Sequence, residues 1–129
     1  MSPLADTWNG RTWTPARLPG APGRFTSFNA LSCPSVRSCV GGGSYTTTVN
    51  GARTGLALAD IWNGARWRQT APPAPAGTVD SDIFSVSCVS ATFCVADGLY
   101  DTRSSGGAMI DSWNGRTWSR MKAAKPRGT

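Results

Sequence analysis

Large apolar and polar residues alternate on both sides of the tripeptide Trp-Asn-Gly, which begins at Trp8, Trp62 and Trp113. A second Trp stands five residues after the first in each copy, and every Trp of the chain belongs to this motif. Alternation with a period of two is typical of β-strands. Asn-Gly between two such segments is a strong hairpin signal, because both central positions of a type I′ turn need a positive φ. Each motif is therefore predicted to form a two-stranded hairpin.

The predicted register gives each hairpin one aromatic face and one small or polar face. Counting back from an Asn-Gly turn places Trp8 opposite Arg11 and Asp6 opposite Trp13. Directly opposed residues share a face of the sheet, as do residues two apart along a strand. The three predicted aromatic faces hold Leu4, Asp6, Trp8 and Trp13; Leu58, Asp60, Trp62 and Trp67; and Met109, Asp111, Trp113 and Trp118.

The four cysteines form a second repeated motif, two C-x5-C segments that lie 55 residues apart. They are predicted to close hairpins whose first arms are residues 28–33 and 83–88 and whose second arms are residues 39–45 and 94–100. A tight hairpin brings opposed Cα atoms to the ~5.5 Å that a disulfide needs. This favours the disulfides Cys33–Cys39 and Cys88–Cys94, with four free buried thiols as the alternative. A zinc site is not favoured, because the spacing differs from the usual knuckles and the chain has no His.

The two hairpin types alternate along the chain and predict an all-β repeat protein. Residues 50–53 and 103–106 are predicted to be loops between them, and Pro- and Gly-rich stretches separate one copy from the next. Four strands in about 50 residues, repeated, are typical of a β-propeller blade. The predicted units are a half blade with its linker at 1–24, full blades at 25–78 and 79–122, and a basic tail at 123–129.

The quoted motifs resemble a known group of repeats. Leu31-Ser32-Cys33-Pro34-Ser35, Val86-Ser87-Cys88-Val89-Ser90 and the three Trp motifs are similar to bacterial, often actinobacterial, β-propeller-like repeats of the form Val-Ser-Cys-x-Ser-x-x-x-Cys…Trp-Asn-Gly-x-x-Trp. The resemblance covers residues 4–121. It implies propeller blades and says little about function, because propellers include lectins, enzymes and protein-interaction proteins.

Two and a half blades cannot close a ring, since known propellers have roughly four to eight. An open stack would also leave an aromatic face in water, beyond the few hundred Å2 of apolar patch that a monomer usually exposes. We expect several copies to assemble into a closed ring, so that the main partner of the chain is the chain itself. The alternative is that the sequence is a piece of a longer propeller.

Charge and composition narrow the partners and the compartment. The chain has 13 Lys and Arg against seven acidic residues, a net charge of +6. Its basic residues are scattered singly except near the C-terminus, so nucleic-acid binding is not favoured. No apolar run approaches the ~20 residues that cross a bilayer. The N-terminal residues lack the pattern of a signal peptide, and an extracellular location is favoured only if the cysteines form disulfides.

Catalytic chemistry has few candidate residues. There is no His and no Glu, and so no Ser-His-Asp or Cys-His arrangement. Asp80 and Asp82 form the one close carboxylate pair outside the repeat, which leaves an Asp-only hydrolase as a third hypothesis. Asp80, Asp82 and Asp101 are better explained as turn residues or weak Ca2+ ligands. No enzyme activity, cofactor or metal is therefore predicted.

The leading functional hypothesis is a non-enzymatic, lectin-like glycan-binding module, and the alternative is a structural or protein-interaction scaffold. The favoured role of the six Trp residues is packing between blades, with each repeated Asp accepting hydrogen bonds from an indole or from backbone amides. The other interpretation is that one exposed Trp per repeat stacks on a sugar ring. Variable ligand contacts are expected in the loops. The candidate contact residues are Tyr45, Asn50, Arg53, Tyr100 and Arg103.

Overall fold

A computed structural model describes residues 5–16, 18, 26–49 and 51–122. Within these residues the chain forms ten strands and no helix, which confirms the predicted all-β class. The strands are β1 (Ala5–Trp8), β2 (Trp13–Ala16), β3 (Thr26–Ser35), β4 (Ser38–Val49), β5 (Ala52–Trp62), β6 (Trp67–Thr70), β7 (Thr78–Ser90), β8 (Phe93–Thr102), β9 (Gly106–Trp113) and β10 (Trp118–Met121).

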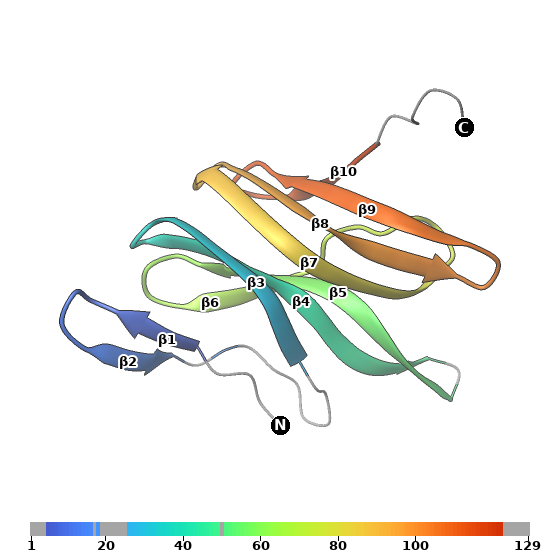
Figure 1. Cartoon of the computed structure of the whole chain (residues 1–129), viewed down its shortest axis with the longest axis horizontal. Helices are drawn as coiled ribbons and strands as arrows, with labels where there is room; N and C mark the ends of the chain where they lie inside the picture. The colour runs from blue at the N-terminus through green and yellow to red at the C-terminus, as the bar shows by residue number, and fades with distance from the viewer. Residues whose placement is uncertain (1–4, 17, 19–25, 50, 123–129) are drawn as a thin grey trace.

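The strands form three antiparallel sheets. The hairpin β1-β2 stands alone, β3 to β6 make the first four-stranded sheet, and β7 to β10 make the second, each in chain order. Figure 1 shows the second sheet lying over the first, and β1-β2 beside the first sheet near β3 and β6. Strand β7 provides most of the contact between the large sheets, because it packs against β3, β4 and β5.

The register of the Trp hairpins differs from the prediction by two residues. Trp8 lies opposite Trp13, not opposite Arg11, and the same pairing joins the Trp residues of the other two copies. The reason is the Asn side chain: Asn9 Oδ1 accepts backbone hydrogen bonds from Arg11 and Thr12, both at 2.8 Å, and Gly10 turns the chain with a φ of 93°. Because the shift is even, each side chain keeps its predicted face.

The connections predicted as loops at residues 50–53 and 103–106 are tighter than expected. Ala52 and Arg53 already belong to β5, and Gly106 begins β9. Gly51 has a φ of 80°, a conformation that permits a reversal within very few residues. In the other copy, the Thr102 N–H donates to the Ser105 carbonyl at 2.7 Å and closes the turn. Both strand pairs therefore extend to their turns.

A backbone bulge recurs at one repeat position in the two large sheets. The pairing of β3 with β4 shifts between Phe28 and Ala30, and that of β7 with β8 shifts between Ile83 and Ser85. Opposite each bulge stands a glycine. A Cβ on Gly43 would lie 1.9 Å from a backbone oxygen of β3, and one on Gly98 would lie 1.8 Å from the matching oxygen of β7. Only glycine fits there.

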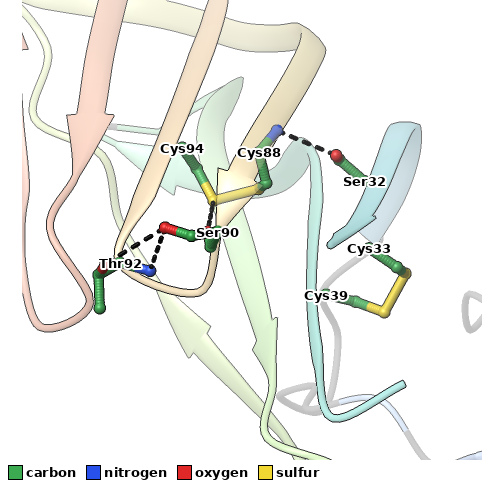
Figure 2. The surroundings of a disulfide bond; sticks show 7 residues. All are labelled: Ser32, Cys33, Cys39, Cys88, Ser90, Thr92 and Cys94. Atoms are coloured by element: carbon green, nitrogen blue, oxygen red, sulfur yellow. Dashed lines mark hydrogen bonds between the residues drawn. A yellow bond between two sulfur atoms is a disulfide. The ribbon is translucent and has the colours of Figure 1, made fainter. Parts of the chain in front are cut away.

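Both predicted disulfides are present. Cys33 is bonded to Cys39 and Cys88 to Cys94, each with Cα atoms 4.0 Å apart. Figure 2 shows the two bridges on neighbouring sheets, linked by a hydrogen bond of 3.0 Å from the Cys88 N–H to Ser32 Oγ. The pairs are compatible with an oxidising, extracellular location.

The core lies between the two large sheets. The aromatic face of the second sheet meets the small-residue face of the first, and eight of the nine buried apolar residues of the described chain form two clusters, Leu58 being the exception. One contains Val40, Ala59, Cys94 and Trp113, and the other contains Ala57, Ile83, Ala96 and Met109. The fold thus stacks an aromatic face on the small face of the sheet that precedes it.

Candidate functional site

The three Trp pairs have the same local geometry in three different environments. Their ring centroids are 5.3, 5.5 and 5.3 Å apart, because the two rings of each pair are directly opposed across a hairpin. Trp113 is 3% exposed in the core between the large sheets, and Trp62 is half-buried. Trp8 is 47% and Trp13 65% exposed. Packing therefore accounts for the third pair, while the first pair remains open to solvent.

The repeated Asp is likewise exposed in the first copy and buried in the other two. Asp6 is exposed, whereas Asp60 and Asp111 are 1% and 0% exposed. Burial raises the pKa of both buried carboxyls from the ordinary 3.8 to about 7, and Arg120 opposes the rise at Asp111. The hydrogen bonds predicted for them are not formed, since neither carboxyl has a partner among the described residues. Asp6 is therefore the one repeated carboxylate that can meet a ligand.

The indole N–H groups, expected to donate to these carboxyls, have other partners. The Trp118 indole donates to Thr70 Oγ1 at 2.9 Å, and the Trp62 indole donates to the Val36 carbonyl at 3.3 Å. The Trp67 indole nitrogen is buried and has no hydrogen-bond partner within the described part of the chain. The reason is that Ala16 is the repeat equivalent of Thr70, the residue that accepts the hydrogen bond from Trp118, and alanine has no hydroxyl to accept one from Trp67. Ala16 and Trp67 line one cavity.

A cavity of ≈ 410 Å3 lies where the β1-β2 hairpin meets the first sheet, and we call it the tryptophan cavity. Strand β1 supplies an exposed carboxylate and an exposed indole, and β5 and β6 supply two half-buried indoles. The hydrogen bond from Trp62 to Val36 fixes one of these rings. The lining residues are Asp6, Thr7, Trp8, Leu31, Cys33, Ser35, Val36, Cys39, Trp62 and Trp67.

A second cavity, of ≈ 640 Å3, lies at the end of the sheets that carries the β4-β5 and β8-β9 connections. This end of the sheets is at the right of Figure 1. We call it the arginine groove, because Arg53 and Arg103 line it. Asp80 is held at its wall by a hydrogen bond of 3.0 Å from the Gly55 N–H. Its lining residues are Thr46, Ala52, Arg53, Thr54, Gly55, Leu56, Thr78, Val79, Asp80 and Arg103.

The structure brings together only part of the predicted ligand set. Arg53 and Arg103 share the arginine groove, but Tyr45 and Tyr100 are half-buried and do not line it. Tyr100 instead packs against the second core cluster. Asn50 lies outside the described residues. The arginine groove therefore has charge and hydroxyl groups but no aromatic ring.

The carboxylate pair considered for catalysis is engaged in holding the sheets together. Asp82 Oδ1 accepts a hydrogen bond of 2.9 Å from Asn29 Nδ2, which also donates to the Ile83 carbonyl at 2.8 Å. Burial raises the pKa of Asp82, while hydrogen bonds from Ser44, Asn29 and the Ile83 backbone lower it and Asp80 raises it. Asn29 and Asp82 thus join β3 to β7.

Within residues 5–16, 18, 26–49 and 51–122, the chain contains no cluster of three or more His, Cys, Asp or Glu side chains placed to hold a metal ion. The same residues form no helix long and apolar enough to cross a membrane.

No protein-family model, curated protein sequence or solved structure matches this chain. The resemblance to propeller-like repeats therefore depends on the sequence motifs alone.

The tryptophan cavity is the part of the site that the loop-based prediction missed. Leu31 and Val36 reach it from β3 and from the β3-β4 turn, so the site depends on how the hairpin sits against the first sheet. One sequence signal pointed toward it, namely that the sequence holds three Trp motifs against two C-x5-C segments, so that the first Trp motif is not matched by a cysteine hairpin of its own. That motif supplies Asp6 and Trp8, which the structure leaves exposed.

Proposed function

We propose that this chain is a non-enzymatic binding module that takes a glycan in the tryptophan cavity, as one protomer of a propeller-like oligomer. The observation that carries the proposal is the meeting of exposed Trp8, half-buried Trp62 and exposed Asp6 around one cavity of ≈ 410 Å3. That volume lies in the range of small-ligand sites, roughly 300–1,000 Å3.

The chemistry of the lining suits a sugar ring. An indole offers a flat apolar surface for the C–H face of a sugar, and it costs little conformational entropy to hold. The Asp6 carboxylate accepts hydrogen bonds from hydroxyl groups, and the hydroxyls of Thr7 and Ser35 both donate and accept. A ligand with an apolar face and a ring of hydroxyls matches both sets of groups.

The arginine groove is the weaker glycan site. Arg53, Arg103 and Asp80 provide charge, but no aromatic ring lines the groove to receive a sugar face. The proposal is non-enzymatic because the two carboxyls with a pKa of about 7, Asp60 and Asp111, are sealed from solvent. A general acid must reach its substrate within hydrogen-bond distance.

Replacing Asp6 and Trp8 tests the site. On a glycan array, the wild-type chain should retain one class of sugar, and that sugar should change its Trp fluorescence. Asp6→Asn should weaken binding about ten-fold, the effect of losing a charged hydrogen-bond acceptor. Trp8→Ala should remove the stacking surface and weaken binding by more. Titration of the retained sugar by fluorescence and by calorimetry measures both effects.

Arg103→Ala is the matched control, because it alters the arginine groove and leaves the tryptophan cavity intact. It should bind the sugar as the wild type does. Loss of binding in Arg103→Ala with retention in Asp6→Asn would move the site to the arginine groove. A folded wild-type protein that retains no sugar at all would contradict the glycan proposal.

The second candidate function is a protein-interaction scaffold without a small-molecule site. The observation that favours it is Trp13, which is 65% exposed and lines neither the tryptophan cavity nor the arginine groove. Under this alternative, sugars produce no response, whereas Trp13→Ala changes the association state of the protein. Sedimentation velocity next to the glycan titration separates the two functions.

A further inference from the structure

The chain stacks its sheets in one direction. Trp113 of the second sheet packs with Val40 and Ala59 on the small-residue face of the first sheet. The hairpin follows the same rule, because Thr14 and Ala16 on its small face line a cavity opposite the Trp rings of the first sheet. Each aromatic face therefore points toward the small face of the preceding sheet.

This order leaves two unlike surfaces open. The first is the aromatic face of the hairpin, with Trp8 and Trp13 at 47% and 65% exposure. The second is the outer face of the second sheet, whose side chains alternate with the buried ones of β7 to β10. This outer face carries Phe84, Val95, Leu99, Ile110 and Met121, of which Phe84, Leu99 and Met121 are 49%, 54% and 43% exposed.

We propose that a second copy of this chain docks the aromatic face of its hairpin on the outer face of the second sheet. The model for this interface is the contact between the two large sheets within one chain. Val40, Ala59 and Thr70 receive Trp113 and Trp118 on the first sheet. Their repeat equivalents on the outer face, Val95, Ile110 and Met121, are all apolar.

Met121 is the most specific member of this set. It takes the place of Thr70, which accepts the hydrogen bond from the Trp118 indole. Trp13 is the repeat equivalent of Trp118, so the interface pairs Trp13 of one copy with Met121 of the next. A thioether packs well against an aromatic ring and is a weak acceptor for an indole N–H.

The two-stranded form of the described hairpin also fits this arrangement. The first sheet carries Gly42 where Ile83 and Val86 of β7 approach, whereas the equivalent position on the outer face is Asp97, which is exposed. Strand β7 would therefore not fit there. The described hairpin consists of β1 and β2 alone, so it covers Val95, Ile110 and Met121 on β8, β9 and β10 and leaves Asp97 in solvent.

The interface is heterologous, since each copy uses two different surfaces. Copies therefore add in one direction until a ring closes, and a two-fold dimer is not the end point. This inference rests on the oligomeric part of the proposed function. Trp8 belongs both to the docked face and to the lining of the tryptophan cavity, so a docked copy and a sugar compete for that ring.

Two complementary variants test the polarity of the interface. Trp13→Asp damages the hairpin face and Met121→Asp damages the outer face. Each variant alone should remain a 13.5 kDa monomer in sedimentation velocity, at concentrations at which the wild type associates. Mixed together, they should form a one-to-one complex and nothing larger, because one intact copy of each face remains.

Controls keep the test decisive. Ala76→Asp places the same charge in the exposed β6-β7 connection and should associate as the wild type does. Ile110→Asp replaces Met121→Asp if that variant shows no cooperative thermal transition. A wild-type monomer at all concentrations overturns the inference, as does an Met121→Asp variant that still dimerises. Met121→Asp should still bind the retained sugar, which distinguishes failure of assembly from failure of the glycan site.

Discussion

Asp60 and Asp111 show what burial does to a carboxyl in this fold. Both are sealed, and neither has a hydrogen-bond partner among the described residues, so the charged form is disfavoured and the pKa of each rises to about 7. Their repeat equivalent Asp6 stays exposed. The same residue type at the same motif position is thus open to solvent in one copy and sealed from it in the other two.

The raised pKa of Asp60 predicts that the protein loses stability as the pH rises. The folded carboxyl keeps its proton up to about pH 7, whereas the unfolded one releases it near its ordinary pKa of 3.8. Relative to its value above pH 7, the free energy of unfolding is therefore highest below about pH 4, and this extra stability is lost by about pH 7. In between, the free energy of unfolding falls by about 1.4 kcal/mol per pH unit for each such carboxyl. Urea unfolding from pH 4.5 to 8 measures this slope.

Asp60→Asn removes one titrating group and should reduce the slope, with greater stability than the wild type at pH 8. Asp111→Asn should act in the same direction. Asp101→Asn alters an exposed carboxyl and is the control, so it should keep the wild-type slope. An Asp60→Asn variant with an unchanged slope would show that this carboxyl does not keep its proton in the folded state.

At the scale of the element, the two cysteine hairpins form a matched pair. Both disulfides have the same sequence separation of 6, so the loop-entropy contribution of each is about 2–3 kcal/mol. Their surroundings differ, because Cys94 is 1% exposed within the core and Cys33 is exposed. A comparison of the two bridges therefore separates packing from chain entropy.

We expect removal of the Cys88–Cys94 bridge to cost more than removal of Cys33–Cys39. The double variant Cys33→Ala/Cys39→Ala should lose about 2–3 kcal/mol of unfolding free energy. Cys88→Ala/Cys94→Ala should lose that amount and about 1 kcal/mol more, because it also leaves a cavity beside Trp113. Urea unfolding of the three proteins at one pH gives the difference. Equal losses would mean that the buried sulfur contributes no packing energy.

The elements were largely predictable from the sequence, whereas their contacts were not. Alternation and turn residues predicted the strands, and the C-x5-C spacing predicted both disulfides. The hairpin register was wrong because Asn9 bonds across a longer turn, through its backbone N–H to the Thr12 carbonyl and through its side chain to the Arg11 and Thr12 N–H groups. The tryptophan cavity was missed because Leu31 and Trp8 come together only through the position of the hairpin on the first sheet.

At the scale of the whole molecule, the stack is held by small residues facing large ones. Gly42 lies in the middle of β4, where glycine weakens a strand unless something approaches closely. Here the branched side chains of Ile83 and Val86 approach: a Cβ on Gly42 would lie 2.5 and 2.8 Å from their Cγ2 atoms. Ile83 is fully buried in the second core cluster, so it has no space into which to move.

Gly42→Ala should therefore push the two large sheets apart and destabilise the protein by about 1–3 kcal/mol, the usual cost of overpacking a core. Gly107→Ala is the control, because its added Cβ would make an ordinary contact of 3.4 Å with Tyr100. That variant should be neutral or slightly stabilised, since alanine lowers the entropy of the unfolded chain. Ile83→Ala should relieve the clash, so the double variant Gly42→Ala/Ile83→Ala should cost less than the sum of the single ones. Urea unfolding of the four variants measures this coupling, and additive losses would show that β7 does not press on β4 at this point.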